Sequence, residues 1–307
     1  MPTAIPPSTT PVPRRALLFG GSGQIGARVI EGLLARGWQV GALSRQSRQE
    51  RPGLHWLAGD LATLPPLPGR YDAIFSCGPL DHFARWYAQA GADAPRVVAF
   101  GSTSVEVKRD SADPHERDLA ARLRQGEEQL FAAALAKGAA ATVLRPTLVY
   151  GAGQDRTLAA IAALARRTGF FVLPRDARGR RQPVHVQDLA DAALAVLDVP
   201  AACGNRYALG GGEVLDYRDM VARVLASLQP PARLLAVPAS AFSLLLSGAH
   251  ALGRLRALNR TALRRMREDL VFDIEPARRD FGYAPRSFQP QDAAGPRSAA
   301  AEAAGTQ

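Results

Sequence analysis

A short glycine-rich turn near the N-terminus holds the residues whose spacing says most about chemistry. The segment 16–26 reads ALLFGGSGQIG, so its glycines fit both G-x-x-G-x-x-G and G-x-G-x-x-G. Glycine lets the backbone approach a pyrophosphate closely, and a helix that begins directly behind the turn points its positive end at the phosphates. We therefore predict a dinucleotide-binding turn made by Gly20, Ser22, Gly23, Gln24, Ile25 and Gly26.

Regular elements of the right kind surround this turn. Apolar stretches alternate with helical patterns through the first half of the chain, which predicts an α/β fold with a doubly wound, Rossmann-type parallel sheet. Ligands of such sheets bind at the carboxyl ends of the strands, where Ser44, Asp60, Gly78 and Ser102 are expected to meet the turn. We predict strands at 16–19, 39–43, 54–57, 73–77, 97–100 and 142–144, and helices at 24–36, 83–90 and 118–137.

The rhythm of strand and helix changes after Gly151. A helix is predicted at 157–168, an Arg/Gly-rich turn at 175–181, a helix at 189–197 capped by Asp188, and then a mostly helical remainder. We therefore expect a cofactor domain at 14–150 and a smaller C-terminal substrate lobe at 151–290. The segments 1–13 and 291–307 are rich in Pro and Thr or in Ala, and both are expected to be disordered tails.

Composition places the chain in a broad class. It has 307 residues, of which 47% are hydrophobic, enough for a substantial core. No apolar run approaches the roughly 18 to 20 residues that cross a bilayer, and the first residues lack the apolar stretch of a signal peptide. We expect a cytoplasmic protein. Cys77 and Cys203 form no metal-type cluster, so two reduced thiols are expected.

The formal charge of +10 is carried almost entirely by arginine, because Lys108 and Lys137 are the only lysines. A basic chain raises the alternative of a nucleic-acid-binding protein. The arginines are scattered, however, and no recognisable readout motif accompanies them. An anionic phosphate ligand explains part of the excess more simply.

Taken in order, several short motifs resemble the extended short-chain dehydrogenase/reductases, the NAD(P)-dependent nucleotide-sugar epimerase/dehydratase group, over about residues 15–290. Each motif is weak alone, and their order and spacing together are specific. They are the glycine turn, Gly59-Asp60-Leu61, Ser102-Thr103-Ser104, Leu144-Arg145-Pro146 with Val149-Tyr150-Gly151, and the segment 181–190 that reads RQPVHVQDLA.

The resemblance implies roles for individual residues. Asp60 and Leu61 would lie near the adenine of the cofactor, and Gly78 near a ribose. Arg181 would grip the diphosphate of a nucleotide-sugar substrate, a ligand that suits a bidentate guanidinium. The implied activity is hydride transfer at a carbonyl of a nucleotide-linked sugar, and the family is compatible with a homodimer through the helices at 83–90 and 118–137.

The second strand ends with residues that discriminate between cofactors. A carboxylate there would hold both ribose hydroxyls of NAD, whereas this chain has Ser44 and Arg45, with Arg48 close by. A guanidinium and a hydroxyl would bind the 2′-phosphate of NADP. We predict NADP as the cofactor, with NAD as the alternative.

One departure from the family affects the mechanism. None of the six tyrosines is followed by lysine four residues later, and aligning 128–130 with the family's helix places Ala120 and Arg124 at the Tyr-x-x-x-Lys positions. Thr103 or Ser102 would still hydrogen-bond the reacting oxygen, and Arg124 could orient the ribose. The proton would come from another group, with Asp81, His82, Tyr150 and Glu127 as candidates. The alternative is a catalytically inactive nucleotide-binding protein with a structural or sensing role.

Overall fold

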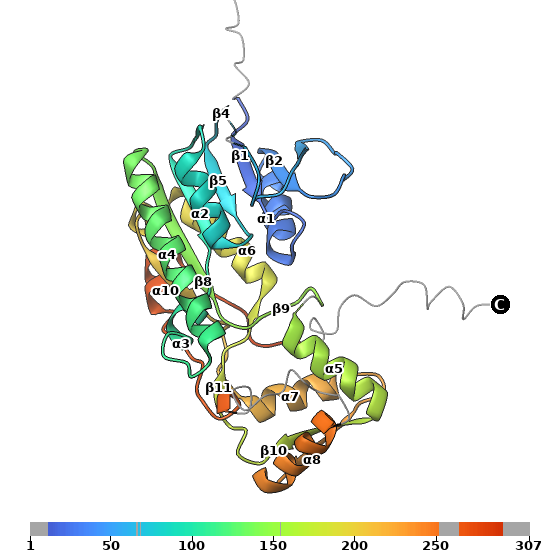
Figure 1. Ribbon diagram of the computed structural model, residues 1–307. Coiled ribbons are helices and arrows are strands. Elements are labelled where there is room, and N and C mark those ends of the chain that lie inside the picture. The colour runs from blue at the N-terminus through green and yellow to red at the C-terminus, as the bar shows by residue number, and fades with distance from the viewer. Residues whose placement is uncertain (1–11, 66, 68, 154, 252–263, 291–307) are drawn as a thin grey trace, which may run out of the picture.

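The computed structural model describes residues 12–290 except 66, 68, 154 and 252–263. The expected tails were 1–13 and 291–307, and all of their residues except 12 and 13 lie outside the described residues. The chain forms a large sheet covered by helices and a smaller lobe built around a two-stranded sheet (Figure 1).

The central sheet has seven parallel strands in the order β13-β8-β7-β5-β1-β2-β3, which confirms the predicted Rossmann-type fold. Six of these strands were predicted from their apolar runs. The seventh, β13, was not, because it has only four residues and follows two short 3₁₀ turns, Val196–Asp198 and Pro200–Ala202. The strands are β1 Arg15–Phe19, β2 Gln39–Ser44, β3 Leu54–Ala58, β5 Ala73–Ser76, β7 Arg96–Phe100, β8 Ala140–Pro146 and β13 Arg206–Leu209.

Helices cover both faces of this sheet because side chains of each strand alternate between two cores. In β1, Leu18 packs into the core under α1 (Gln24–Ala35) and α6 (Val186–Ala195), whereas Leu17 and Phe19 pack under α2 (Leu80–Gln89) and α4 (Pro114–Ala136). Pro114 at the first turn and the Asp113 side chain, which accepts from the His115 N–H at 2.9 Å, start the long α4. The short α3 (Ser104–Val107) follows β7 directly.

The smaller lobe has its own apolar core and lies below the sheet in Figure 1. Its helix α5 begins where Asp155 caps the N–H groups of Leu158 and Ala159, and ends at Gly169 in the left-handed region. The strand pair was not predicted in the part expected to be helical. The lobe contains α5 Arg156–Thr168, β10 Phe170–Pro174, α7 Tyr217–Ala226, β15 Arg233–Val237 and α8 Ala239–Ala251.

The chain after Gly151 contributes to both parts of the molecule, since β13 pairs within the large sheet and α6 packs against that sheet. Two small ladders connect the parts, β9 (Val149–Tyr150) with β12 (Val184–His185), and β11 (Arg180–Arg181) with β14 (Leu215–Asp216). A third ladder pairs β4 (Gly69–Arg70) with β6 (Ala92–Asp93), and α10 (Glu275–Phe281) lies beside β13.

One helix start differs from its prediction. The helix α6 begins at Val186, where the Nδ1 atom of His185 accepts from the Gln187 N–H at 3.2 Å, so His185 and not Asp188 is the cap. Asp188 instead accepts from the backbone N–H and the Nε–H of Arg286, at 3.0 and 2.8 Å. The prediction was wrong because Arg286 is 98 residues away in the chain, and no local pattern shows that it contacts Asp188.

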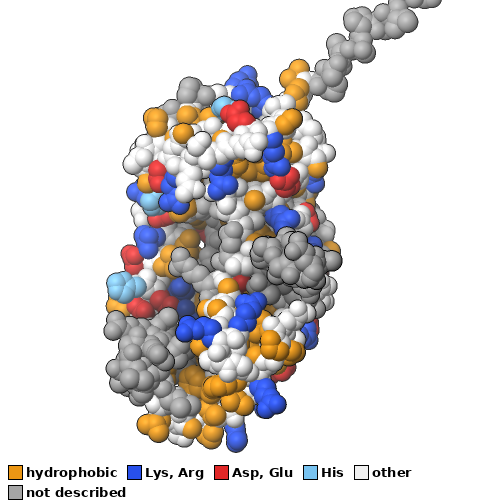
Figure 2. Space-filling view, turned by 90° about the vertical axis from the view of Figure 1, so that its right-hand side faces the viewer, with side chains coloured by type: hydrophobic (Ala, Val, Ile, Leu, Met, Phe, Trp, Pro, Cys, Tyr) orange, Lys and Arg blue, Asp and Glu red, His pale blue; other side chains and the backbone are white. Residues whose placement is uncertain are grey.

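The structure also describes the hydropathy of the helices, the two cysteines and the distribution of surface charge. No helix in the described part of the chain is long and apolar enough to cross a membrane. Cys77 and Cys203 are both free thiols, and burial raises the pKa of Cys77 to about 12. On the face seen in Figure 2, Lys and Arg side chains are spread from top to bottom and interleaved with acids, rather than gathered in one basic stripe.

Candidate active site and cofactor crevice

The glycine turn lies where the strand order reverses. The strands on one side of β1 continue through β2 and β3, whereas β5 lies on its other side, so the two halves of the sheet diverge at this point. Gly20 has φ +76°, and a Cβ on it would lie 2.7 Å from the Cys77 carbonyl carbon and 2.8 Å from the Gly78 nitrogen. Only glycine allows the two loops to meet so closely, and such a crevice is the usual dinucleotide site of this architecture.

The start of α1 is open toward the same crevice. Its cap residue, Gly23, has no side chain to occupy the first N–H groups, and no acid lies in the first turn. A Cβ on Gly26 would lie 2.2 Å from the Gly20 oxygen, so the turn requires glycine there too. The Gln24 Oε1 atom is buried and has no hydrogen-bond partner among the described residues. Free N–H groups, a positive helix end and a close backbone approach fit a cofactor pyrophosphate.

The residues expected near the adenosine lie at the ends of β2, β3 and β5. Asp60 accepts from the Ala62 N–H at 2.9 Å, which fixes the loop after β3, and Leu61 lies close to Gly78. The Ser44 hydroxyl donates to the Gln46 carbonyl at 2.7 Å and so holds its own turn. The Arg45 side chain is exposed beside it.

A cavity of about 620 Å³ lies between the carboxyl end of β7 and the smaller lobe, a volume typical of small-molecule sites. Its apolar wall comes mainly from α5, β10 and the segment that follows the undescribed residues 252–263. The residues lining it are Ser102, Thr103, Ser104, Val107, Lys108, Thr147, Leu148, Thr157, Ala160, Ile161, Leu164, Phe171, Arg181, Gln182, Tyr217, Arg265, Met266, Leu270 and Phe272.

The predicted hydroxyls, Ser102 and Thr103, both line this cavity. Thr103 is 7% exposed, and its Oγ1 donates to the Pro146 carbonyl at 3.1 Å. The Ser102 Oγ accepts from the Ser104 N–H at 3.1 Å and keeps its own proton for another acceptor. Ser102 can therefore donate to a substrate oxygen, whereas the Thr103 hydroxyl, whose proton goes to the Pro146 carbonyl, can accept a hydrogen bond there.

Arg181 also lines the cavity, and its guanidinium is largely used within the protein. It donates to the carbonyls of Arg180 and Glu268, at 2.8 and 2.7 Å, and to that of Arg265. It lies 5.1 Å from the centre of the Tyr217 ring. Burial lowers the pKa of Arg181 and raises that of Tyr217. These hydrogen bonds connect the segments around Arg180, Arg265 and Glu268 and so stabilise this side of the cavity wall.

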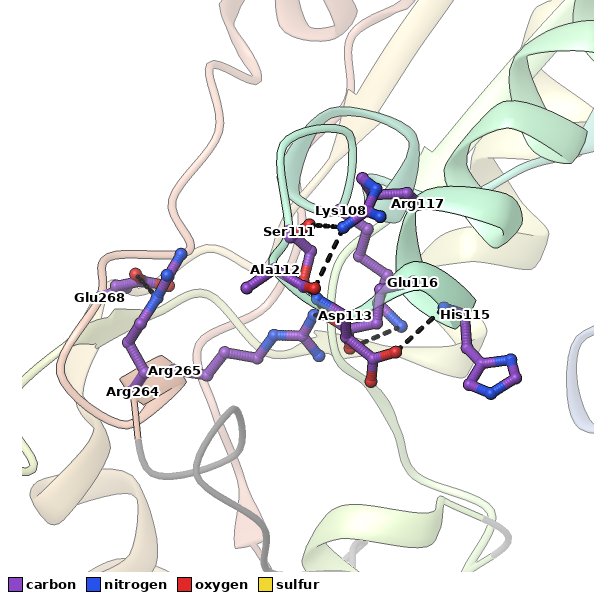
Figure 3. A network of polar contacts seen from close by, with 10 residues as sticks. All are labelled: Lys108, Ser111, Ala112, Asp113, His115, Glu116, Arg117, Arg264, Arg265 and Glu268. Carbon is purple, nitrogen blue, oxygen red and sulfur yellow. Dashed lines mark hydrogen bonds and ion pairs between the residues drawn. The ribbon is translucent and has the colours of Figure 1, made fainter.

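A polar cluster that was not predicted from the sequence lies at one side of the cavity (Figure 3). Lys108 follows α3, and its Nζ lies 3.7 Å from the Glu116 Oε1. The other Glu116 oxygen accepts from the Ser111 hydroxyl at 2.7 Å and pairs with Arg265. The one available signal was that Lys108 is one of only two lysines in an arginine-rich chain.

The other catalytic candidates do not line the cavity. Tyr150 is fully buried, its hydroxyl donates to the Ser287 carbonyl at 3.4 Å, and its ring packs edge-on against His185. Arg124 is exposed on α4, and Ala120 on the same helix is fully buried. The structure therefore does not bring Tyr150 or Arg124 to Thr103.

The remaining proton-donor candidates also lie elsewhere. Asp81 is placed 3.9 Å from His82 and 3.7 Å from Arg122, in the contact between α2 and α4. Glu127 is 1% exposed and forms ion pairs with Arg145 and Arg206.

The comparisons with known proteins agree with this geometry. Residues 84–210 match the NAD dependent epimerase/dehydratase family. The family resemblance drawn from the sequence is thereby confirmed. The matched segment runs from α2 to the end of β13 and includes Ser102 and Thr103. The family is NAD-dependent, so the coarser prediction of a nicotinamide cofactor is supported, and the choice between NADP and NAD is not decided.

Individual proteins extend the similarity beyond that segment. A 2-alkyl-3-oxoalkanoate reductase of Stenotrophomonas maltophilia is 29% identical, over 89% of this chain and 95% of that protein. An epimerase structure from Methanothermobacter thermautotrophicus is 16% identical with a TM-score of 0.66, covering 92% of this chain and 90% of its own. The structure of MoeE5 with UDP-glucose and NAD is 19% identical, also with a TM-score of 0.66, covering 91% and 96%. Both structures show the same fold.

Proposed function

We propose that the protein is an NAD(P)-dependent oxidoreductase that transfers a hydride at the ketone of a 3-oxo carboxylic acid with hydrocarbon chains. The observation that carries the proposal is the apolar cavity beside Thr103 and Ser102. The nicotinamide cofactor supplies or accepts the hydride when bound, and we propose NADP, held by the glycine turn with Arg45 at its 2′-phosphate. The protein residues bind and orient the ketone.

The chemistry of the cavity wall favours hydrocarbon over sugar. Aliphatic and aromatic side chains of α5, β10 and 266–272 form most of it. Several polar groups there already bond within the protein. The Gln182 amide donates to the Gly211 carbonyl at 3.2 Å and accepts from the Phe272 N–H at 3.2 Å, and the Thr147 hydroxyl donates to the Gln182 carbonyl. These two side chains are therefore less available to the hydroxyls of a sugar, whereas apolar groups gain from burial here.

The similarity to the 2-alkyl-3-oxoalkanoate reductase supports the same substrate class, since it spans nearly the whole of both chains. A substrate of that type carries one ketone and hydrocarbon on either side of it. Ser102 would donate to the ketone oxygen with Thr103 beside it, and α5, Phe171 and Met266 would surround the chains.

A nucleotide-linked sugar is the second candidate. It is favoured by Arg181 in the cavity wall and by MoeE5, whose structure contains UDP-glucose and NAD. In that case the guanidinium would have to bind a diphosphate with the N–H groups that its three backbone carbonyls leave over.

The test is to follow NADPH and NADH absorbance with purified protein and two substrate sets. One set contains 2-alkyl-3-oxo acids of increasing chain length, and the other contains nucleotide-linked 4-keto sugars. We expect oxidation of NADPH with the 3-oxo acids, rising with chain length. Turnover of the sugars alone would overturn the proposal. Cofactor binding without turnover of either set would favour the inactive nucleotide-binding protein.

A further inference from the structure

The cationic groups of the cavity outnumber the acids that contact them. Lys108, Arg181 and Arg265 all line the wall, and none of the lining residues is an acid. Among the described residues, Glu116 is the one acid that pairs with any of these three side chains. The nearby acids are engaged elsewhere, Glu268 with Arg264 at 2.6 Å and Asp269 with Arg180 at 2.7 Å. An excess of positive charge in a partly enclosed, apolar site favours an anionic ligand group.

Lys108 keeps all the donors of its ammonium group for a ligand. Its side chain is 21% exposed, and its Nζ makes no hydrogen bond to the described residues, because 3.7 Å to Glu116 is beyond hydrogen-bond distance. Arg265 pairs with Glu116 through one guanidinium nitrogen, Nη2, which leaves its other N–H groups for a ligand. Arg181 donates to three backbone carbonyls.

The Glu116 carboxylate lies beside two of these cations, Lys108 and Arg265. The Ser111 hydroxyl fixes it at 2.7 Å, and in Figure 3 it lies between Lys108 and Arg265. A ligand carboxylate arriving from the cavity would approach the same two cations. Glu116 therefore both positions Lys108 and Arg265 and opposes a second negative charge beside them.

We propose that Lys108 and Arg265 bind the carboxylate of an amphipathic substrate, whose hydrocarbon lies along the apolar wall. This inference rests on the proposed function for the identity of the reaction, and it assigns the residues that select an acid over a neutral molecule. Its site is the cavity side of the Lys108–Glu116–Arg265 cluster.

The spacing suits a 3-oxo acid. One carbon separates the ketone carbon from the carboxylate carbon in such a molecule, so the two groups must be held a few ångströms apart. Thr103 precedes α3 and Lys108 follows it. A helical rise of about 1.5 Å per residue puts their Cα atoms roughly 8 Å apart, and both residues line the same cavity.

The test measures binding of dodecanoate by calorimetry, with dodecanol as the uncharged probe of equal chain length. Dodecanoate has no ketone, so binding is read without turnover. We expect wild-type protein to bind dodecanoate more tightly than dodecanol. Lys108→Met should weaken dodecanoate binding by about 10- to 100-fold, and Arg265→Met by a similar factor, with little effect on dodecanol.

Two further variants sharpen the test. Glu116→Gln should tighten dodecanoate binding several-fold, because it removes the opposing charge, an effect opposite in sign to that of Lys108→Met. Arg264→Gln is the matched control, since Arg264 is 61% exposed, does not line the cavity and pairs with Glu268. If Arg265→Met fails to fold, Lys108→Met and Glu116→Gln still decide the question.

The outcomes separate this inference from the proposed function. Equal binding of dodecanoate and dodecanol, or a Lys108→Met variant with an unchanged ratio of the two affinities, overturns the inference. Reduction of 3-oxo acids with a KM that Lys108→Met leaves unchanged overturns it as well. The expected dodecanoate results without reduction of any 3-oxo acid would support the carboxylate site and refute the proposed reaction.

Discussion

Arg145 donates its Nε–H to one Glu127 oxygen at 2.8 Å and pairs through a second guanidinium nitrogen with the other. Arg206 adds a third bond to the same carboxylate, at 3.0 Å, so α4 is joined to β8 and β13 through one buried acid. Glu127 was a candidate proton donor from the sequence. Its position in this cluster, outside the cavity lining, indicates a structural role instead.

Glu127→Gln should therefore reduce stability and leave the chemistry of the folded protein intact. Removing the carboxylate charge leaves the partly exposed Arg206 without its acid and Arg145 with Glu106 alone, which should cost about 3 kcal/mol of unfolding free energy. Urea unfolding measures the loss. Glu128→Gln, at the exposed next position, is the control and should change the free energy by less than about 0.5 kcal/mol. A stable Glu127→Gln variant with greatly reduced kcat would restore the proton-donor hypothesis.

Arg45→Ala tests the proposed cofactor preference. The exposed guanidinium after β2 should contribute a charge-assisted bond to the 2′-phosphate, so its loss should raise the Kd of NADPH about 10-fold and leave that of NADH unchanged. Fluorescence titration gives both constants. Arg51→Ala is a suitable control, because Arg51 is already paired with Glu31. Equal wild-type affinities for NADH and NADPH would disprove the preference.

Thr103→Ala tests the role of the cavity hydroxyl. If the Thr103 hydroxyl turns from the Pro146 carbonyl to stabilise charge on the substrate oxygen, its loss should lower kcat by roughly 10²- to 10³-fold with little change in the Kd of NADPH. Thr103→Ser should recover most of the rate because it keeps the hydroxyl. An alanine variant of normal kcat would assign the oxygen contact to Ser102 alone.

The parts of the candidate site that the sequence could predict are those that depend on neighbours along the chain. The glycine turn follows its own strand and starts its own helix, and Ser102 and Thr103 lie directly behind β7. Lys108 was missed because its importance depends on Glu116 and on Arg265, which is 149 residues farther along than Glu116. The burial of Tyr150, a catalytic candidate, could not be predicted for the same reason, since its contacts with 287–289 come from the far end of the described chain.

The elements of the fold that were predicted are likewise those with a strong pattern along the chain. Long apolar strands with helices between them were predicted to within a few residues at most of their ends. The strands β13 and β15 were not predicted. Each forms by pairing with a strand more than 50 residues earlier in the chain, β13 with β8 and β15 with β10. A four- or five-residue segment carries too little pattern of its own to show such a partner.

Asp155 gives the protein a pH-dependent stability with a predictable sign. It caps α5, which forms part of the cavity wall, is 7% exposed, and has a buried Oδ2 without a partner among the described residues. Burial raises its pKa above the usual range, so over the interval between the unfolded and folded pKa the folded protein binds more protons than the unfolded chain. Stability contributed by the neutral acid is then lost as pH rises through the folded pKa.

Asp155→Asn keeps an oxygen for the Leu158 and Ala159 N–H groups without the charge. Its unfolding free energy relative to wild type should therefore increase from about pH 4 to pH 7 in urea titrations. Asp155→Ala loses the cap itself and should be about 1 kcal/mol less stable than Asp155→Asn throughout. A relative stability of Asp155→Asn that falls as pH rises would show that the carboxylate is stabilised in the folded state and that its pKa is lowered.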